Sequence, residues 1–180
     1  MALTLNNLTK DIGYTKLIDD PIKASRGGWI FAKPNSRQNQ SVDPLKTNDL
    51  RELYDLLSPN YKGRCTAPLL VDLKTKQIVS NESSDIVRMF NKNSDFYPKH
   101  LSKQIDDINA WTYDLLNNGV YRCGFSTTQS AYDKASNDVR LGLQKCNDLL
   151  KDQMYLCGSK FTEADIRLLP TMLRKSRFLF

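Results

Sequence analysis

The feature of this sequence that most constrains its fold is a proline followed by two short apolar stretches. Pro68 opens the first stretch, Leu69–Asp72, and Gln77–Ser80 forms the second after a lysine-rich turn. A residue without an N–H group is admitted to a sheet only at an edge or at the start of a strand. The pattern therefore predicts a β-hairpin whose first strand begins just after Pro68.

A run of polar residues follows the second stretch directly. The segment Asn81–Ser84 consists of residue types that favour helix starts, which predicts a helix from about Glu82 to Phe90. A helix start exposes unpaired N–H groups and a partial positive charge, and it can bind a carboxylate. Beside a proline-led strand, this pattern indicates a site for a small peptide with a free carboxylate. Helix capping alone is the competing interpretation.

The residues before the hairpin complete an α/β pattern. Alternating apolar and polar residues over Ile12–Ile18 predict a strand, and apolar residues at helical spacing predict a helix from Leu50 to Leu57. The order of strand, helix, hairpin and helix matches the later part of a thioredoxin-like domain. We expect residues 1–90 to form this domain and the polar segment 91–100 to be a linker.

The chain beyond the linker has a helical pattern throughout. One apolar helix face starts at Ile105 and is interrupted at Gly119, which we interpret as a glycine C-cap. A later helix starts at Thr162, whose hydroxyl group we expect to cap an N–H near Asp165. Residues 101–180 are therefore predicted to form an all-α domain.

Composition excludes several classes of function. The net charge is +6, but the basic residues are spread singly along the chain, so we expect no nucleic-acid partner. No apolar run approaches the roughly 20 residues that span a bilayer. The four cysteines form no CxxC pair and there is one histidine, so no metal site is expected. With no signal-peptide pattern, a cytoplasmic location is predicted.

A set of short motifs occurs in order from about Ala2 to Arg174. The motifs are Gly63-Arg64, Ala67–Leu70, Ser80–Met89, Asn118–Arg122, Gly124-Phe125, Thr128-Gln129, Ala131-Tyr132, Tyr155–Gly158 and Thr162–Leu168. Together they resemble the xi class of glutathione transferases, the glutathionyl-hydroquinone reductases, which are near relatives of the omega class. The resemblance implies a thioredoxin-like domain followed by an all-α glutathione transferase domain, with glutathione as co-substrate.

The resemblance also implies roles for residues around the hairpin. The peptide bond before Pro68 is expected to be cis, so that the N–H and C=O groups of Ala67 pair with the cysteinyl unit of glutathione. Glu82 would accept a hydrogen bond from the γ-glutamyl ammonium group, and Ser83 would donate to the γ-glutamyl carboxylate. Such charge-assisted bonds are stronger than neutral ones.

Four further residues are candidates on the same basis. Trp29 would line the glutathione pocket, although a core tryptophan is the alternative. Arg64 would meet a carboxylate of glutathione, or would be a solvated loop charge. Tyr121 would face the hydroquinone and assist proton transfer, or would only contribute to packing. Arg122 is its neighbour in the implied substrate cleft.

The attacking thiol of the family is expected outside this sequence. It lies in a Cys-Pro-Trp-type motif at the start of the first helix, and Ala2–Leu8 resembles the end of that helix. We therefore expect the motif, and the sheet neighbour of Ile12–Ile18, upstream of Met1, and further helices after Arg174. Cys65 occupies a variable position of the family pattern and is not assigned as a nucleophile.

Two functions from different classes follow. The first is a glutathione-dependent thiol transferase that reduces glutathionyl-hydroquinones through the upstream cysteine, so that the chain alone is predicted to be inactive. The second is a non-catalytic binding or structural module with the transferase fold. The implied partners are glutathione and a hydroquinone or quinone conjugate, with no membrane partner, and assembly as a homodimer is compatible with both functions.

Overall fold

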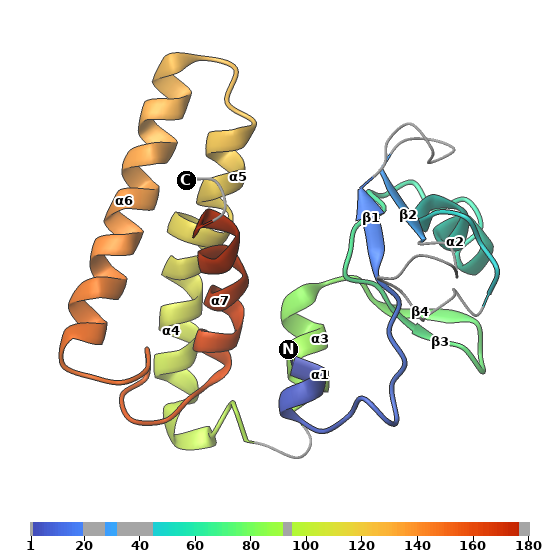
Figure 1. The fold of residues 1–180 in the computed structure, drawn as a ribbon, viewed down its shortest axis with the longest axis horizontal. Helices are drawn as coiled ribbons and strands as arrows, with labels where there is room; N and C mark the ends of the chain where they lie inside the picture. Colours follow the sequence, from blue (N-terminus) through green and yellow to red (C-terminus); the bar gives the residue numbers. More distant parts are fainter. Residues whose placement is uncertain (1, 20–27, 32–44, 92–94, 177–180) are drawn as a thin grey trace. The chain divides into compact units, whose positions relative to one another are not determined.

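The computed structural model describes residues 2–19, 28–31, 45–91 and 95–176, without the side chains of residues 174–176. The chain forms two compact units, one of residues Asn7–Phe90 and one of Met1–Asn6 together with Asn91–Phe180 (Figure 1). Part of the expected linker, residues 92–94, lies outside the described residues. No helix in the described ranges is long and apolar enough to cross a membrane.

The first unit contains the predicted hairpin. Strand β3 (Leu70–Asp72) pairs antiparallel with β4 (Gln77–Ser80), which confirms the prediction apart from one residue at the start. The turn is held by the Asp72 carboxylate, whose Oδ1 accepts hydrogen bonds from the N–H groups of Lys74 (2.8 Å) and Thr75 (3.1 Å). This local geometry explains why the sequence alone was sufficient to locate the hairpin.

The predicted strand over Ile12–Ile18 was wrong in its extent and in its partner. Strand β1 covers only Leu17–Asp19 and pairs antiparallel with β2 (Trp29–Phe31), with Ile18 opposite Ile30. A strand needs a neighbour to bond its backbone groups, and among the described residues β2 lies opposite Leu17, Ile18 and Asp19. A neighbour for this part of the chain therefore lies within the sequence, downstream.

Helix α2 (Leu50–Leu57) is fixed by its own sequence. The side chain of Asp49 accepts a hydrogen bond from the N–H of Glu52 at 2.8 Å, which is a regular N-cap. Leu53 and Tyr54 are buried, so the apolar face of the helix packs into the core of this unit. The hairpin and the start of helix α3 (Ser83–Met89) follow this helix in sequence.

The second unit is helical. Its long segments lie side by side in Figure 1, where α6 runs back along α4 and α5. The helices are α1 (Ala2–Leu5), the 3₁₀ turn η1 (Lys99–Leu101), α4 (Ser102–Thr112), the π-helical turn η2 (Tyr113–Asn117), α5 (Gly119–Gly124), α6 (Gln129–Lys151) and α7 (Glu163–Ser176).

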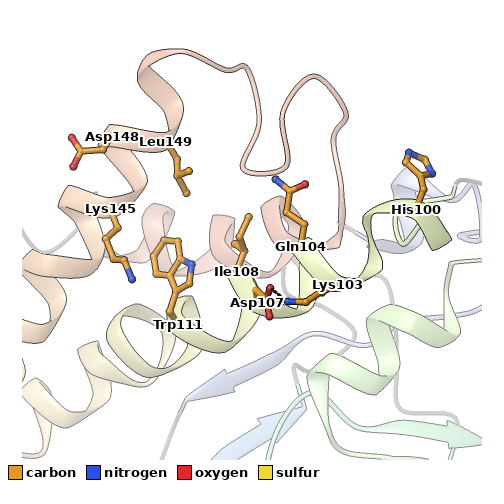
Figure 2. Close-up of a pocket in the computed structure, with 9 residues that line it drawn as sticks. All are labelled: His100, Lys103, Gln104, Asp107, Ile108, Trp111, Lys145, Asp148 and Leu149. Atoms are coloured by element: carbon orange, nitrogen blue, oxygen red, sulfur yellow. Dashed lines mark hydrogen bonds and ion pairs between the residues drawn. The ribbon is translucent and has the colours of Figure 1, made fainter.

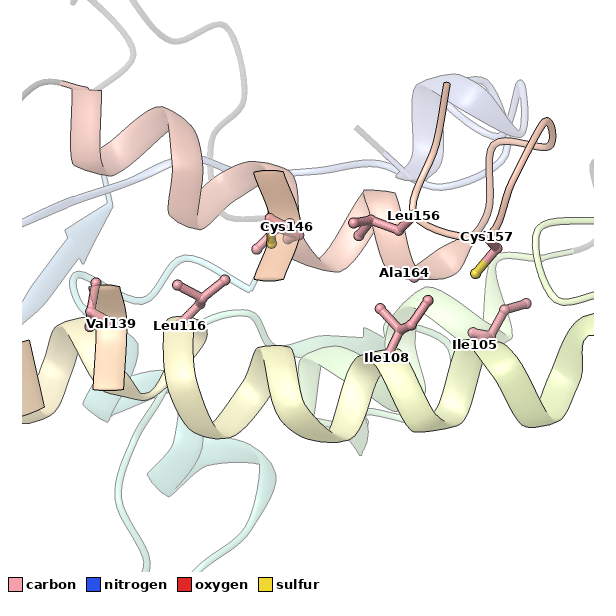
Figure 3. Close-up of a cluster of buried hydrophobic side chains, with 9 residues drawn as sticks. Ile105, Ile108, Leu116, Val139, Cys146, Leu156, Cys157 and Ala164 are labelled. Carbon is pink, nitrogen blue, oxygen red and sulfur yellow. The ribbon is translucent and has the colours of Figure 1, made fainter. Parts of the chain in front are cut away.

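The core of this unit lies between α4, η2, α6 and α7 (Figure 3). Its buried members are Ile105, Ile108, Leu116, Val139, Cys146, Leu156, Cys157, Ala164 and Leu168. The members in α4, α6 and α7 are three, seven and four residues apart, as on one face of a helix, so the apolar pattern read from the sequence corresponds to this part of the core. Leu156 and Cys157 lie in the connection between α6 and α7.

Two local predictions in this unit need correction. Gly119 does not end a helix: it is the first residue of α5, and Asn118 before it has helical angles. A Cβ at Gly119 would lie 3.0 Å from the Cγ2 atom of Val139, so glycine here permits close helix packing. At the start of α7 the direction of capping is reversed, because the Asp165 carboxylate accepts from the N–H (2.9 Å) and the hydroxyl group (3.2 Å) of Thr162.

Candidate ligand site around Pro68

The backbone just before the hairpin is exposed and open to a ligand. The peptide bond between Ala67 and Pro68 is cis, as predicted, and both residues are exposed. Within the described part of the chain, neither the N–H nor the C=O group of Ala67 has a hydrogen-bond partner. Ala67 thus presents one donor and one acceptor on the surface.

The start of α3 forms the second part of the site. Glu82 is the N-cap residue, and its Oε1 atom accepts from the N–H (3.2 Å) and the hydroxyl group (3.1 Å) of Ser84. The hydroxyl group of Ser83 lies 3.5 Å from the same oxygen. The carboxylate therefore has the capping role that was the competing interpretation, while Glu82 and Ser83 both remain exposed.

One asparagine brings these two parts together. The Nδ2 atom of Asn81 lies 3.5 Å from Oγ1 of Thr66 and 3.4 Å from the hydroxyl group of Tyr61. Thr66 directly precedes Ala67, and Asn81 directly precedes Glu82. The exposed backbone of Ala67 and the carboxylate of Glu82 therefore belong to one place on the surface of the first unit.

Helix α2 supports this place through two residues that sequence reasoning missed. The guanidinium group of Arg51 donates to the carbonyl oxygen of Tyr61 (3.1 Å) and to Sγ of Cys65 (3.3 Å). The hydroxyl group of Tyr54 donates to the carbonyl oxygen of Thr66 at 3.0 Å. The helical spacing of α2 predicts on which face of the helix Arg51 and Tyr54 lie. No signal in the sequence predicts which loop groups they bond.

Trp29 and Arg64 are less firmly connected to the site. Trp29 lies in β2, is 41% exposed, and follows Gly28, whose φ of +103° favours glycine. In the described ranges, no hydrogen bond or ring contact joins Trp29 to Ala67 or Glu82. The side chain of Arg64 is exposed at the surface of the loop.

The two candidates for the substrate cleft belong to α5 of the helical unit. Tyr121 is 47% exposed, and its ring stacks on that of Phe125 with 6.4 Å between the centroids. Arg122 forms an ion pair with Asp138 of α6, with 3.0 Å between Nη2 and Oδ2. Tyr121 thus presents an aromatic surface, while the charge of Arg122 is already balanced within the unit.

The helical unit also carries an open groove between α4 and α6 (Figure 2). The Nζ atom of Lys145 lies 4.9 Å from the centroid of the Trp111 ring. Two lysines and two aspartates line the groove, so charge favours neither an anion nor a cation. The lining residues are His100, Lys103, Gln104, Asp107, Ile108, Trp111, Lys145, Asp148 and Leu149.

Two of the four cysteines are unsuited to nucleophilic chemistry. Cys146 and Cys157 are buried in the helical core, and burial raises the pKa of Cys146 to about 11 and raises the pKa of Cys157. Their thiols are therefore protonated at neutral pH. Across the described residues, no group of three or more His, Cys, Asp or Glu side chains could hold a metal ion.

Comparison with known proteins decides the family. A sequence profile of the glutathione S-transferase C-terminal domain matches residues 88–179. The chain belongs to the glutathione transferase family. Two curated relatives are the glutathionyl-hydroquinone reductases YqjG of Escherichia coli, 44% identical over 156 residues, and PcpF of Sphingobium chlorophenolicum, 39% identical over 155 residues. Both matches cover 82% of this chain, and they cover 47% and 49% of the relatives.

Solved structures place the transferase chain in the xi class. The glutathione-bound structure of Escherichia coli YqjG matches with a TM-score of 0.86 and 39% identity, over 96% of this chain and 58% of that one. The xi transferase of Phanerochaete chrysosporium matches with a TM-score of 0.87 and 39% identity, over 96% and 61%. The chain spans about half the length of its curated relatives. These likenesses confirm the resemblance inferred from the motifs, including the combination of thioredoxin-like and helical parts.

Proposed function

We propose that this chain supplies the glutathione-binding surface of a glutathionyl-hydroquinone reductase. The observation that supports the proposal most directly is the exposed, unpartnered backbone of Ala67 next to the start of α3. Within a family that uses glutathione, such a surface can bind a γ-glutamyl peptide. It offers a donor and an acceptor for the peptide backbone and polar groups for the charged end.

Each part of glutathione has a proposed partner here. The N–H of Ala67 donates to the cysteinyl carbonyl group, and its C=O accepts from the cysteinyl N–H. Glu82 accepts from the γ-glutamyl ammonium group, while the hydroxyl and N–H groups of Ser83 donate to the adjacent carboxylate. Trp29 forms a wall of the pocket, and the exposed guanidinium group of Arg64 meets the glycyl carboxylate.

The second substrate is a hydroquinone that carries glutathione through a C–S bond. In the proposal, Tyr121 donates a hydrogen bond to a quinol oxygen or transfers a proton there, and Phe125 extends the aromatic surface. Arg122 lies beside them, held by Asp138. A location in the cytoplasm and assembly as a homodimer stay predictions.

The reaction needs a thiolate, which we assign to a cysteine of a longer protein rather than to this chain. That thiolate attacks the glutathione sulfur, so the bond between sulfur and the ring breaks. The ring carbon keeps the electron pair and takes a proton, which releases the hydroquinone. The thiolate of a second glutathione then attacks the mixed disulfide, giving glutathione disulfide and restoring the cysteine.

Titration calorimetry with glutathione tests the binding surface. The double variant Glu82→Gln with Ser83→Ala keeps an oxygen that can cap α3 but removes the charge and the hydroxyl group. We expect it to bind about tenfold or more weakly, because each bond to a charged group contributes about 1.5–3 kcal/mol. A double variant of exposed hairpin residues, Lys74→Ala with Gln77→Ala, is the control. Equal affinity of the parent and the Glu82 and Ser83 variant would refute the assignment.

Activity gives an independent check on the proposed nucleophile. The chain alone is expected to show no turnover of a glutathionyl-hydroquinone, since loss of a nucleophile removes several orders of magnitude of rate. Turnover that persists in the Cys65→Ser variant would contradict the need for a cysteine outside this sequence. Turnover that disappears in that variant would instead identify Cys65 as the nucleophile.

A further inference from the structure

We propose that helix α2 aims the Ala67 amide at the ligand, through the hydroxyl group of Tyr54 and the guanidinium group of Arg51. Both are positioning residues, because neither needs to touch the ligand. The inference rests on the proposed function, in which the Ala67 backbone binds glutathione. It adds the reason why an exposed loop keeps one orientation of that backbone.

The loop before Pro68 has no regular secondary structure to hold its backbone. Residues 64–68 form no helix or strand, and Thr66, Ala67 and Pro68 are all exposed. Ordering one residue of flexible backbone costs about 1–2 kcal/mol. If the loop were free, glutathione binding would have to meet this cost, and the affinity would fall accordingly. Contacts from a rigid element remove the cost before the ligand arrives.

The geometry of one peptide unit links Tyr54 to Ala67. The Tyr54 hydroxyl group donates to the carbonyl oxygen of Thr66 at 3.0 Å, and this carbonyl belongs to the same peptide unit as the Ala67 N–H. In the described ranges only the Ala67–Pro68 bond is cis, so this unit is trans. In a planar trans peptide, the C=O and N–H bonds point in opposite directions. Holding the Thr66 oxygen toward Tyr54 therefore points the Ala67 N–H away from α2.

The hydroxyl group that does this is itself held in place. Tyr54 is completely buried, and its ring lies against that of Tyr61 with 4.9 Å between the centroids. Leu50 and Leu53 on the same helix are buried with it. Because the core fixes the ring, the hydroxyl oxygen has one position, and the orientation of the Thr66–Ala67 peptide follows from it.

Arg51 holds the preceding part of the same loop. Its Nη2 atom donates to the carbonyl oxygen of Tyr61 at 3.1 Å, and its Nη1 atom donates to Sγ of Cys65 at 3.3 Å. Its Nε atom lies 3.3 Å from the carboxylate of Asp55, one helical turn further along α2. A planar guanidinium group can serve these partners at once, whereas the single ammonium group of lysine cannot.

The variant Tyr54→Phe tests the proposal, because it removes the hydroxyl group and keeps the ring in the core. The control is Tyr97→Phe in the helical unit, which removes the hydroxyl group that bonds Asp106 at 2.6 Å. Glutathione affinity of the 180-residue chain is measured by titration calorimetry. We expect about three- to tenfold weaker binding for Tyr54→Phe, as for one lost hydrogen bond, and parent affinity for the control.

A second readout separates positioning from general loosening of the fold. In ligand-free protein, the ¹⁵N–¹H resonance of the Ala67 amide should move in Tyr54→Phe and stay in place in Tyr97→Phe. Equal melting temperatures of the two variants would show that a difference in affinity does not come from stability. If Tyr54→Phe fails to fold, Arg51→Lys carries the test, with the same expected loss of affinity.

The outcomes distinguish this inference from the proposed function. If the parent binds glutathione and folded Tyr54→Phe binds equally well, the positioning role is overturned and the binding surface stands. If Tyr54→Phe does not fold and Arg51→Lys binds like the parent, the positioning role is overturned as well. If the parent shows no binding at all, the proposed function fails, and the positioning role fails with it.

Discussion

Replacing Gly142 by alanine tests how tightly α6 packs on the helical core. A methyl group at Gly142 would lie 2.7 Å from Cγ and 2.8 Å from Cδ2 of Leu116, and 2.9 Å from Cβ of Leu115. Leu116 is completely buried, so its side chain cannot turn toward solvent. The Cβ atom of Leu115 is attached directly to the backbone. Relief of the overlap therefore requires α6 and the π-helical turn to move apart.

The magnitude follows from two opposing effects. Alanine favours the interior of a helix over glycine by about 1 kcal/mol. Overpacking of a filled core costs about 1–3 kcal/mol. Since three atoms of two residues are closer than 3.0 Å and one of them is a Cβ atom, we place the cost in the upper part of that range. The net effect of Gly142→Ala is then a loss of about 1–2 kcal/mol in the free energy of unfolding.

The matched control is Gly124→Ala at the end of α5. A methyl group there would meet nothing within 4 Å, so this variant keeps the propensity effect without the overlap. Urea denaturation followed by circular dichroism gives both free energies. We expect Gly142→Ala to be less stable than Gly124→Ala by about 2–3 kcal/mol. Equal stability, or a more stable Gly142→Ala, would refute the packing argument.

Two further predictions concern buried groups of the helical unit. Glu163 is 1% exposed and accepts hydrogen bonds from Asn109 (3.1 Å) and Arg167 (3.2 Å). In urea denaturation, Glu163→Ala should therefore lower the free energy of unfolding by about 3 kcal/mol, and Glu163→Gln should lower it by less. Burial raises the pKa of Cys146 from 9.0 to about 11, so the folded thiol stays protonated where the unfolded one ionises. Stability should therefore fall between pH 9 and 11, and urea midpoints of Cys146→Ala should show a smaller fall over that interval. Parent-like stability of Glu163→Ala would contradict the role of the buried carboxylate. A parent-like fall in the stability of Cys146→Ala between pH 9 and 11 would contradict the role of the buried thiol.

Local signals in the sequence were sufficient for much of the fold. The hairpin was located by a proline and a polar turn, helix α2 by apolar residues at helical spacing, and the start of α3 by residues suited to helix starts. The interactions that decide them lie within a few positions, such as the carboxylate of Asp72 on the N–H groups of Lys74 and Thr75. Because such interactions involve residues that are close in the sequence, they can be predicted from residue type and spacing.

Predictions failed where a residue far along the chain makes the decision. The partner of β1 is β2, which lies further along the chain and pairs with Leu17, Ile18 and Asp19 among the described residues. The role of Gly119 depends on Val139 of α6, which lies too close for a larger residue. Local propensity contained no information about the neighbouring element in either case.

The same distinction between local and distant interactions applies to the candidate site. The motif around Pro68 and the polar segment at the start of α3 were both visible in the sequence, and they led to Ala67 and Glu82. The contact of Asn81 with Thr66 joins residues 15 positions apart, and that of Tyr54 with Thr66 joins residues 12 apart. Contacts at such separations exist only after the core has closed and brought the elements together. The sequence by itself therefore determined which groups could bind a ligand, and the tertiary structure decided where they point.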